Sequence, residues 1–251
     1  MRAVKLYSTG DIRTVNVDVP SPAKDEILIK VEAAGICGTD RHLYHGEFPS
    51  VPEKILGHEF SGIVVDSGET EIPEGARVTC DPNTWCGACS QCQRGRVNLC
   101  INNLATGIHR DGGFAEFCVF PASKAVVLPD KLNPLYGAFC EPLACTLHGM
   151  DMGAAQEGET VLVIGGGVIG LMAVQLAKLA GAKVLLMTRS PEKQTLGLNI
   201  GADYAVGTES EVRAIWPEGA DLVVECAGVS ATVTLSHKLT RSGGRVVILG
   251  V

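Results

Sequence analysis

The chain has 251 residues and a formal net charge of −7, with 46% hydrophobic and 20% charged residues. These proportions are those of a globular protein with one large domain or two of ordinary size. The negative charge argues against a nucleic-acid partner, which usually requires a basic face. No apolar run reaches the roughly 20 residues that span a bilayer, and the first residues, MRAVK, lack the apolar stretch of a secretory signal. We therefore expect a cytoplasmic protein with no membrane partner.

Residues 1–152 are expected to be rich in β-structure. Short apolar runs at 27–31, 62–65 and 125–128 are separated by glycine, proline and aspartate. Frequent prolines in this part leave little room for long helices. We expect residues 1–152 to form one domain.

From residue 153 the pattern changes to strands that alternate with helices. Strands are predicted at 160–164, 183–188, 204–206, 221–225 and 245–249, and helices at 170–180 and 191–200. Such alternation is typical of an α/β domain, in which helices cover both faces of a parallel sheet. Residues 153–251 should therefore form a doubly wound domain.

A glycine-rich turn lies between the first of these strands and its helix. The segment 165–170 fits G-x-G-x-x-G: Gly165 permits a tight turn, Gly167 lets a pyrophosphate approach the backbone, and Gly170 lets the helix pack closely on the strand. The helix N-terminus offers free N–H groups to the phosphates. The alternative is an ordinary strand-to-helix turn. We predict dinucleotide binding by Gly165, Gly167, Val168, Ile169 and Gly170.

The end of the second strand bears on the choice between NADP and NAD. An Asp or Glu there would accept a hydrogen bond from a free ribose 2′-hydroxyl, but the chain has Thr188, Arg189 and Ser190, followed by Lys193. A guanidinium can instead make charge-assisted bonds to a 2′-phosphate. We therefore favour NADP over NAD. A solvated arginine beside a non-selective pocket is the alternative.

Four of the ten cysteines are crowded into one short segment, about 80–105. Their spacing is Cys86-x2-Cys89-x2-Cys92-x7-Cys100. Four thiolates can enclose Zn²⁺ as a tetrahedron without an open position, which is typical of a structural site. An iron–sulfur cluster or a redox disulfide pair is the alternative, but nothing else indicates electron transfer.

A second metal site, with an open position, is suggested by residues that lie far apart in the chain. Cys37 offers a thiolate, His58 and Glu59 offer an imidazole and a carboxylate side by side, and Glu141 offers a further carboxylate. Mixed sulfur, nitrogen and oxygen ligands with room for water are what catalytic zinc requires. Spacing alone does not decide between this site and a buried cysteine with a core histidine.

These motifs together resemble the zinc-containing medium-chain dehydrogenase/reductase superfamily, closest to its sorbitol (polyol) and threonine dehydrogenase branch. The similarity extends over the whole chain. It is carried by the segments 57–68 (GHEFSGIVVDSG), 111–116 (DGGFAE) and 141–144 (EPLA), together with the cysteine cluster and the glycine turn. Glu71, where the family usually has a small or aliphatic residue, is a minor departure.

The resemblance implies a fold and a set of ligands. Residues 1–152 would form a GroES-like β-barrel catalytic domain containing the structural zinc lobe, and residues 153–251 an incomplete Rossmann domain. Cys37, His58 and either Glu59 or Glu141 would hold the catalytic zinc, giving two zinc ions per chain. The sixth Rossmann strand is absent after Val251, so we expect the chain to be a fragment of a longer protein.

It also implies residue roles in the transfer of hydride between a secondary alcohol or polyol and the nicotinamide. Thr39 would hydrogen-bond the substrate oxygen and His42 would complete a proton relay, although His42 could equally be a surface histidine. Leu249, Gly250 and Val251 would hold the nicotinamide carboxamide. A homodimer or homotetramer is expected. The alternative is a zinc-stabilised NADPH-binding sensor or structural protein without turnover.

Overall fold

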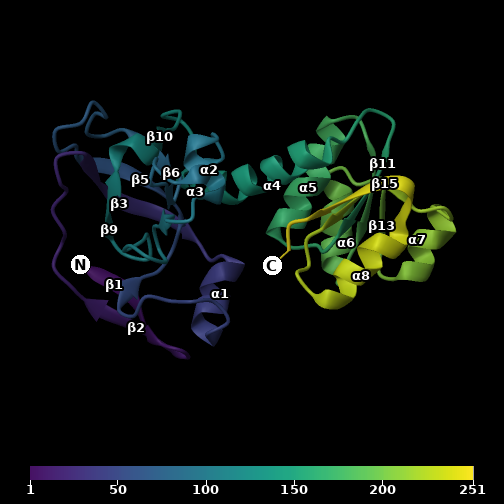
Figure 1. Ribbon diagram of the computed structural model, residues 1–251, viewed down its shortest axis with the longest axis horizontal. Coiled ribbons are helices and arrows are strands. Elements are labelled where there is room, and N and C mark those ends of the chain that lie inside the picture. Colours follow the sequence, from purple (N-terminus) through teal and green to yellow (C-terminus); the bar gives the residue numbers. More distant parts are fainter. Residues whose placement is uncertain (251) are drawn as a thin grey trace. The chain divides into compact units, whose positions relative to one another are not determined.

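The computed structural model describes residues 1–250 and divides into two compact units, Met1–Glu141 and Pro142–Val251 (Figure 1). The division into functional domains near residue 152 stays a prediction. Among residues 1–250, no helix is both long and apolar enough to cross a membrane.

The first unit is built on antiparallel sheets. A five-stranded sheet has the order β10-β6-β5-β3-β9, beside a three-stranded sheet β2-β1-β4 and a two-stranded sheet β7-β8. The strands are β1 (Arg2–Ser8), β2 (Asp11–Asn16), β3 (Glu26–Gly35), β4 (Lys54–Ile55), β5 (Glu59–Asp66), β6 (Arg77–Cys80), β7 (Asn83–Thr84), β8 (Leu104–Ala105), β9 (Phe117–Pro121) and β10 (Ala125–Val127). The helices are α1 (Gly38–His45), α2 (Ser90–Gln93) and α3 (Pro134–Ala138), with short 3-10 turns at Val97–Leu99 and Ala122–Lys124.

Alternating residues of this larger sheet form the core of the first unit. Ile27 and Ile29 of β3 are fully buried against Phe60 of β5 and Phe120 of β9. The two phenylalanine rings meet edge to face, with centroids 5.8 Å apart. The two-residue period places one face of each strand in this core, as expected for a half-buried sheet.

Helix α4 (Cys140–Gly153) was not predicted from the sequence. Pro142 lies in its first turn, where a missing N–H costs no helical hydrogen bond. A proline therefore marks the start of this helix.

The second unit contains a parallel five-stranded sheet of order β13-β12-β11-β14-β15. Its strands and helices are β11 (Thr160–Ile164), α5 (Val168–Leu179), β12 (Lys183–Met187), α6 (Pro191–Asn199), β13 (Tyr204–Val206), α7 (Glu209–Ile215), β14 (Ala220–Glu225), α8 (Ser230–Leu239) and β15 (Thr240–Ile248). The predicted α/β class and the five predicted strands are confirmed.

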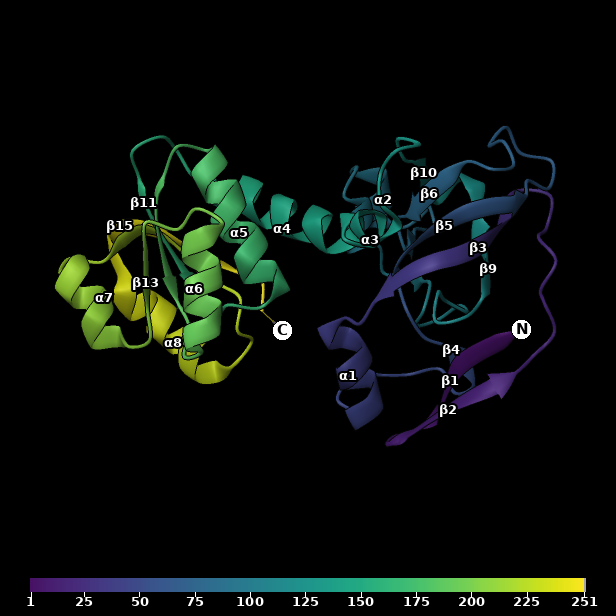
Figure 2. The ribbon, with the colours of Figure 1, turned by 180° about the vertical axis from the view of Figure 1, so that it is seen from behind.

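Both faces of this sheet are buried, which explains its almost continuous apolar strands. Val161 and Val163 of β11 pack in a core with α5, while Leu162 and Ile164 pack in a second core with α7 and α8. Figure 2 shows α5 and α6 in front of the sheet. Apolar side chains on both sides of each strand are the pattern of a parallel sheet covered by helices.

The last strand begins earlier than the sequence suggests. β15 starts at Thr240, which pairs with Ala220, and its register with β14 then shifts before Arg245 pairs with Leu222. Gly243 adopts a φ of +76° within this irregularity. The Ser-Gly-Gly segment is thus a bulge inside the strand, although its composition is that of a turn.

Candidate cofactor and metal sites

The pairing of two strands brings Cys37, His58 and Glu59 together. β3 ends at Gly35, directly opposite Glu59 at the start of β5. Cys37 follows as the N-cap residue of α1, and His58 immediately precedes β5. One ligand atom from each of the three side chains lies within 4.8 Å of the others. Residues more than 20 positions apart in the chain therefore form one candidate metal site.

The two nitrogens of His58 face different groups. Nδ1 lies 3.8 Å from Oδ1 of Asp40, and both atoms are buried without a hydrogen-bond partner among residues 1–250. The other ring nitrogen, Nε2, is the one available to Cys37, which raises the pKa of His58. Ligating histidines commonly direct the second nitrogen to a carboxylate, which fixes the ring for metal binding. Asp40 thus supports the site, and the sequence-based reasoning missed it.

Charge at this cluster alters the acidity of its members. Burial lowers the pKa of His58, but the bond to Cys37 and the charges of Cys37, Asp40 and Glu141 outweigh this effect and raise the pKa to about 9. Burial and the charge of Glu141 raise the pKa of Glu59. Several acidic groups thus crowd one buried position, as expected where a cation normally balances them.

The remaining predicted residues of this site lie at the start of α4 and in α1. Glu141, at the start of α4, acts on His58 and Glu59 through its charge. Thr39 and His42 lie in α1, two and five residues after Cys37. Nδ1 of His42 pairs with the Glu47 carboxylate, and its ring lies edge-on to Phe48.

The four crowded cysteines converge in a small lobe. Sγ of Cys89 lies 3.5 Å from that of Cys92 and 4.0 Å from that of Cys100, and Cys86 and Cys100 are 3.6 Å apart. A tetrahedron with Zn–S bonds of about 2.3 Å has sulfur atoms about 3.8 Å apart. The four thiols therefore fit one zinc ion without rearrangement.

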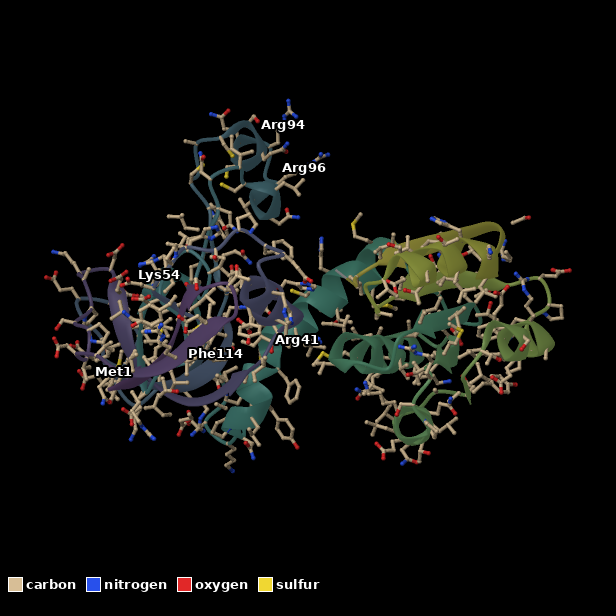
Figure 3. The ribbon with its side chains drawn as sticks, turned by 90° about the horizontal axis from the view of Figure 1, so that it is seen from below. Met1, Arg41, Lys54, Arg94, Arg96 and Phe114 are labelled. Carbon is tan, nitrogen blue, oxygen red and sulfur yellow. The ribbon has the colours of Figure 1, made fainter. Side chains whose placement is uncertain are left out.

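Backbone geometry holds the cysteine lobe in this form. Gly87 and Gly95 have φ values of +71° and +76°, which permit the reversals between closely spaced ligands. The N–H groups of Ala88 and Cys89 lower the pKa of Cys86 to about 6, which favours the thiolate that binds metal. Figure 3 shows Arg94 and Arg96 projecting from the lobe.

The glycine turn of the second unit has the geometry of a dinucleotide site. Gly165 has a φ of +109°, and a Cβ on Gly170 would lie 1.8 Å from the Gly165 carbonyl oxygen. A Cβ on Gly167, by contrast, would meet nothing within 4 Å. The turn and the helix packing thus require glycine, while Gly167 borders open space at the N-terminus of α5, where Val168 and Ile169 begin the helix.

The end of β12 lies beside this turn. A Cβ on Gly166 would approach Oγ1 of Thr188 to 2.9 Å and Cβ of Lys193 to 3.1 Å. Ser190 caps α6 by accepting a hydrogen bond from the Lys193 N–H. Arg189, between Thr188 and Ser190, is exposed. The structure therefore brings two of the predicted cofactor residues to the glycine turn and leaves the Arg189 side chain accessible to a ligand.

The end of β15 carries the other predicted cofactor residues. The N–H groups of Leu249 and Gly250 donate to the Glu225 carbonyl oxygen at 2.8 and 3.0 Å. Val251 lies outside the described residues.

Comparison with known proteins identifies the family. The family model of the alcohol dehydrogenase GroES-like domain matches residues 23–130, and that of the zinc-binding dehydrogenases matches residues 168–251. A sorbitol dehydrogenase of Halalkalibacterium halodurans is 35% identical over 98% of the chain, and D-arabinitol dehydrogenase 1 of Uromyces fabae is 36% identical over 100%. The chain spans 75% of the length of each.

A solved structure is also closely similar. A protein of Sinorhizobium meliloti 1021, described as a zinc-binding dehydrogenase and solved with NADP bound, is 54% identical and superposes with a TM-score of 0.97, covering 100% of this chain and 76% of its own. The chain therefore belongs to the zinc-containing medium-chain dehydrogenase/reductase superfamily, of GroES-like and Rossmann architecture. This membership favours an oxidoreductase over a non-catalytic NADPH-binding protein.

Proposed function

We propose that the chain is a zinc-dependent dehydrogenase that transfers hydride between a secondary alcohol or polyol and NADP, with NAD as the second choice. The convergence of Cys37, His58 and Glu59 supports this proposal most strongly. A thiolate, an imidazole and a carboxylate in that arrangement can hold a zinc ion and leave a position for substrate oxygen. When bound, zinc supplies a Lewis acid that polarises this oxygen.

The residues around the metal site would bind the substrate and move its proton. Asp40 would hold the His58 ring by accepting from Nδ1–H, and Glu141 would serve as an alternative ligand to Glu59. Thr39 Oγ1 would hydrogen-bond the substrate hydroxyl, and the His42 imidazole, held by Glu47, would pass its proton onward. Hydride transfer itself is chemistry that the nicotinamide supplies.

We further propose that the cysteine lobe holds a second, structural zinc ion. Four thiols with sulfur separations of 3.5 to 4.0 Å leave no place for substrate. The lobe would therefore contribute to stability rather than to the reaction. The homodimer or homotetramer and the cytoplasmic location stay predictions.

Turnover before and after removal of metal tests this function. We expect the protein to reduce NADP⁺ or NAD⁺ with at least one polyol, to lose this activity with a chelator, and to regain it with Zn²⁺. Tight NADPH binding without turnover of any alcohol, with both metal sites filled, would instead support the non-catalytic alternative.

The preference for NADP is proposed to depend on Arg189. Arg189 is exposed and directly follows Thr188, which lies beside the glycine turn. Its guanidinium can pair with a 2′-phosphate, whereas an aspartate there would repel the phosphate and accept from a 2′-hydroxyl. We expect Arg189→Asp to lower kcat/KM for NADP⁺ relative to NAD⁺ by about 100-fold, or roughly 2.7 kcal/mol. An unchanged ratio would refute this assignment.

A further inference from the structure

Glu225 is a fully buried glutamate at the carboxyl end of β14, and no role assigned so far uses its side chain. It follows the apolar residues of the strand, where an aliphatic side chain would be buried at lower cost. The function of a carboxyl group buried in this position therefore lies in the hydrogen bonds that it accepts.

Those hydrogen bonds come from the loop that follows β14. Oε1 accepts from the N–H of Ala227 at 2.8 Å and of Gly228 at 3.2 Å, and Oε2 accepts from the Gly228 N–H at 3.3 Å. The carboxylate thus fixes the loop 226–228 by charge-assisted bonds to consecutive backbone groups.

The same glutamate contacts the end of β15. Its carbonyl oxygen accepts from Leu249 and Gly250, and a Cβ on Gly250 would lie 2.7 Å from Oε2 and 2.2 Å from the Gly228 nitrogen. Only a glycine can approach the carboxylate and the loop so closely. Glu225 therefore connects two segments. Its side chain binds the loop 226–228, and its backbone carbonyl binds the segment 249–250.

The loop also borders the glycine turn. Cys226 N–H donates to the Ile164 carbonyl oxygen at 2.8 Å, and a Cβ on Gly165 would lie 3.0 Å from the Ala227 nitrogen. Three segments thus meet at the carboxyl edge of the parallel sheet, which is where ligands bind in open α/β sheets.

We propose that Glu225 is a positioning residue for the nicotinamide half of the dinucleotide. It holds the loop 226–228 and the segment 249–250 in one arrangement, while the glycine turn would hold the pyrophosphate and the end of β12 the adenosine ribose. The inference rests on the proposed function, because it requires that the chain bind a nicotinamide dinucleotide.

Binding of the whole cofactor and of its adenine half distinguishes this role from a general structural one. The variants are Glu225→Gln, which keeps one acceptor oxygen for the two Oε1 bonds, and Glu225→Leu, which removes both acceptors at similar volume. Glu218→Gln, at an exposed glutamate of the same unit, is the control. The probes are NADPH, followed by its fluorescence, and 2′,5′-ADP, followed by calorimetry.

We expect Glu225→Leu to raise the Kd of NADPH at least about tenfold and Glu225→Gln to raise it less, while both variants and the control bind 2′,5′-ADP as the wild type does. Unchanged NADPH affinity in both variants would overturn the inference, as would an equal loss for both probes in Glu225→Gln. If Glu225→Leu does not fold, Glu225→Gln alone decides. Failure of the wild type to bind NADPH or NADH would refute the proposed function instead.

Discussion

Gly35 lies against the carboxylate that the proposed metal site requires. A Cβ added to Gly35 would lie 2.2 Å from Oε2 of Glu59, closer than side-chain atoms can pack. Because the far end of a glutamate is flexible, the Glu59 carboxylate would turn away at little cost to the fold. The absence of a side chain at Gly35 thus permits the Glu59 orientation that faces Cys37 and His58.

Gly35→Ala should therefore weaken metal binding without unfolding the protein. Loss of an oriented ligand or its support lowers metal affinity by about 10- to 100-fold. Competition between the protein and a chelator for Co²⁺, with the cysteine lobe already loaded with zinc, would measure this change. Gly38→Ala is the matched control, because a Cβ there meets nothing within 4 Å. Equal affinities of the two variants would contradict this role of Gly35.

At the scale of elements, Asp221 connects the starts of three strands of the second unit. Its Oδ2 accepts from the Thr160 N–H at 2.8 Å and hydroxyl at 2.7 Å, and its Oδ1 accepts from Arg241 Nε at 2.5 Å. Burial alone would raise the pKa of Asp221, but these bonds outweigh it and lower the pKa from an ordinary 3.8 to about 2. The charged carboxylate thus joins β14 to β11 and β15.

The lowered pKa predicts how stability depends on pH. A carboxyl group with a depressed pKa in the folded state stabilises the protein above its ordinary pKa and loses this effect as the pH falls from about 4 to about 2. Asp221→Asn should lower the free energy of unfolding by about 1–2 kcal/mol at pH 7, and by progressively less below pH 4. Urea unfolding between pH 7 and pH 3 would measure it. The exposed Asp151→Asn is the control, and a difference independent of pH would contradict the assignment.

Elements that depend on local sequence could be predicted, but those that depend on distant contacts could not. The glycine turn and β11 were predicted because strand, turn and helix signals adjoin in the chain. The cysteine lobe was predicted for the same reason, since its ligands lie within 15 residues. By contrast, the bulge in β15 depends on pairing with β14, so the predicted strand at 245–249 omitted the residues from Thr240 onward.

The candidate metal site likewise depends on contacts between distant residues. Cys37 and His58 come together through the register of β3 and β5. Their spacing in the sequence does not predict this association, whereas the family resemblance does. The roles of Asp40 and Glu225 were missed because burial of a carboxyl group cannot be read from its neighbours in sequence. A charged residue directly after an apolar strand, as in Leu222–Glu225, is the one signal that could have indicated the latter.

At the scale of the whole chain, two groups of side chains could each hold a metal ion. One is a set of four thiols in an exposed lobe, and the other is the mixed set of Cys37, His58 and Glu59 beside a buried carboxylate. We propose that the mixed set shares one metal ion of its own. Hydride transfer by the proposed route is impossible without it.

The zinc content of the purified chain and of two variants tests whether the mixed set binds its own ion. We predict two zinc ions per chain in the wild type, one for each ligand group. We predict one in His58→Ala, whose retained lobe zinc would report a folded protein, and one in Cys92→Ser, whose mixed site remains. Two zinc ions in His58→Ala, or a single zinc ion in the wild type that is lost in Cys92→Ser, would show that the mixed set binds no zinc ion of its own.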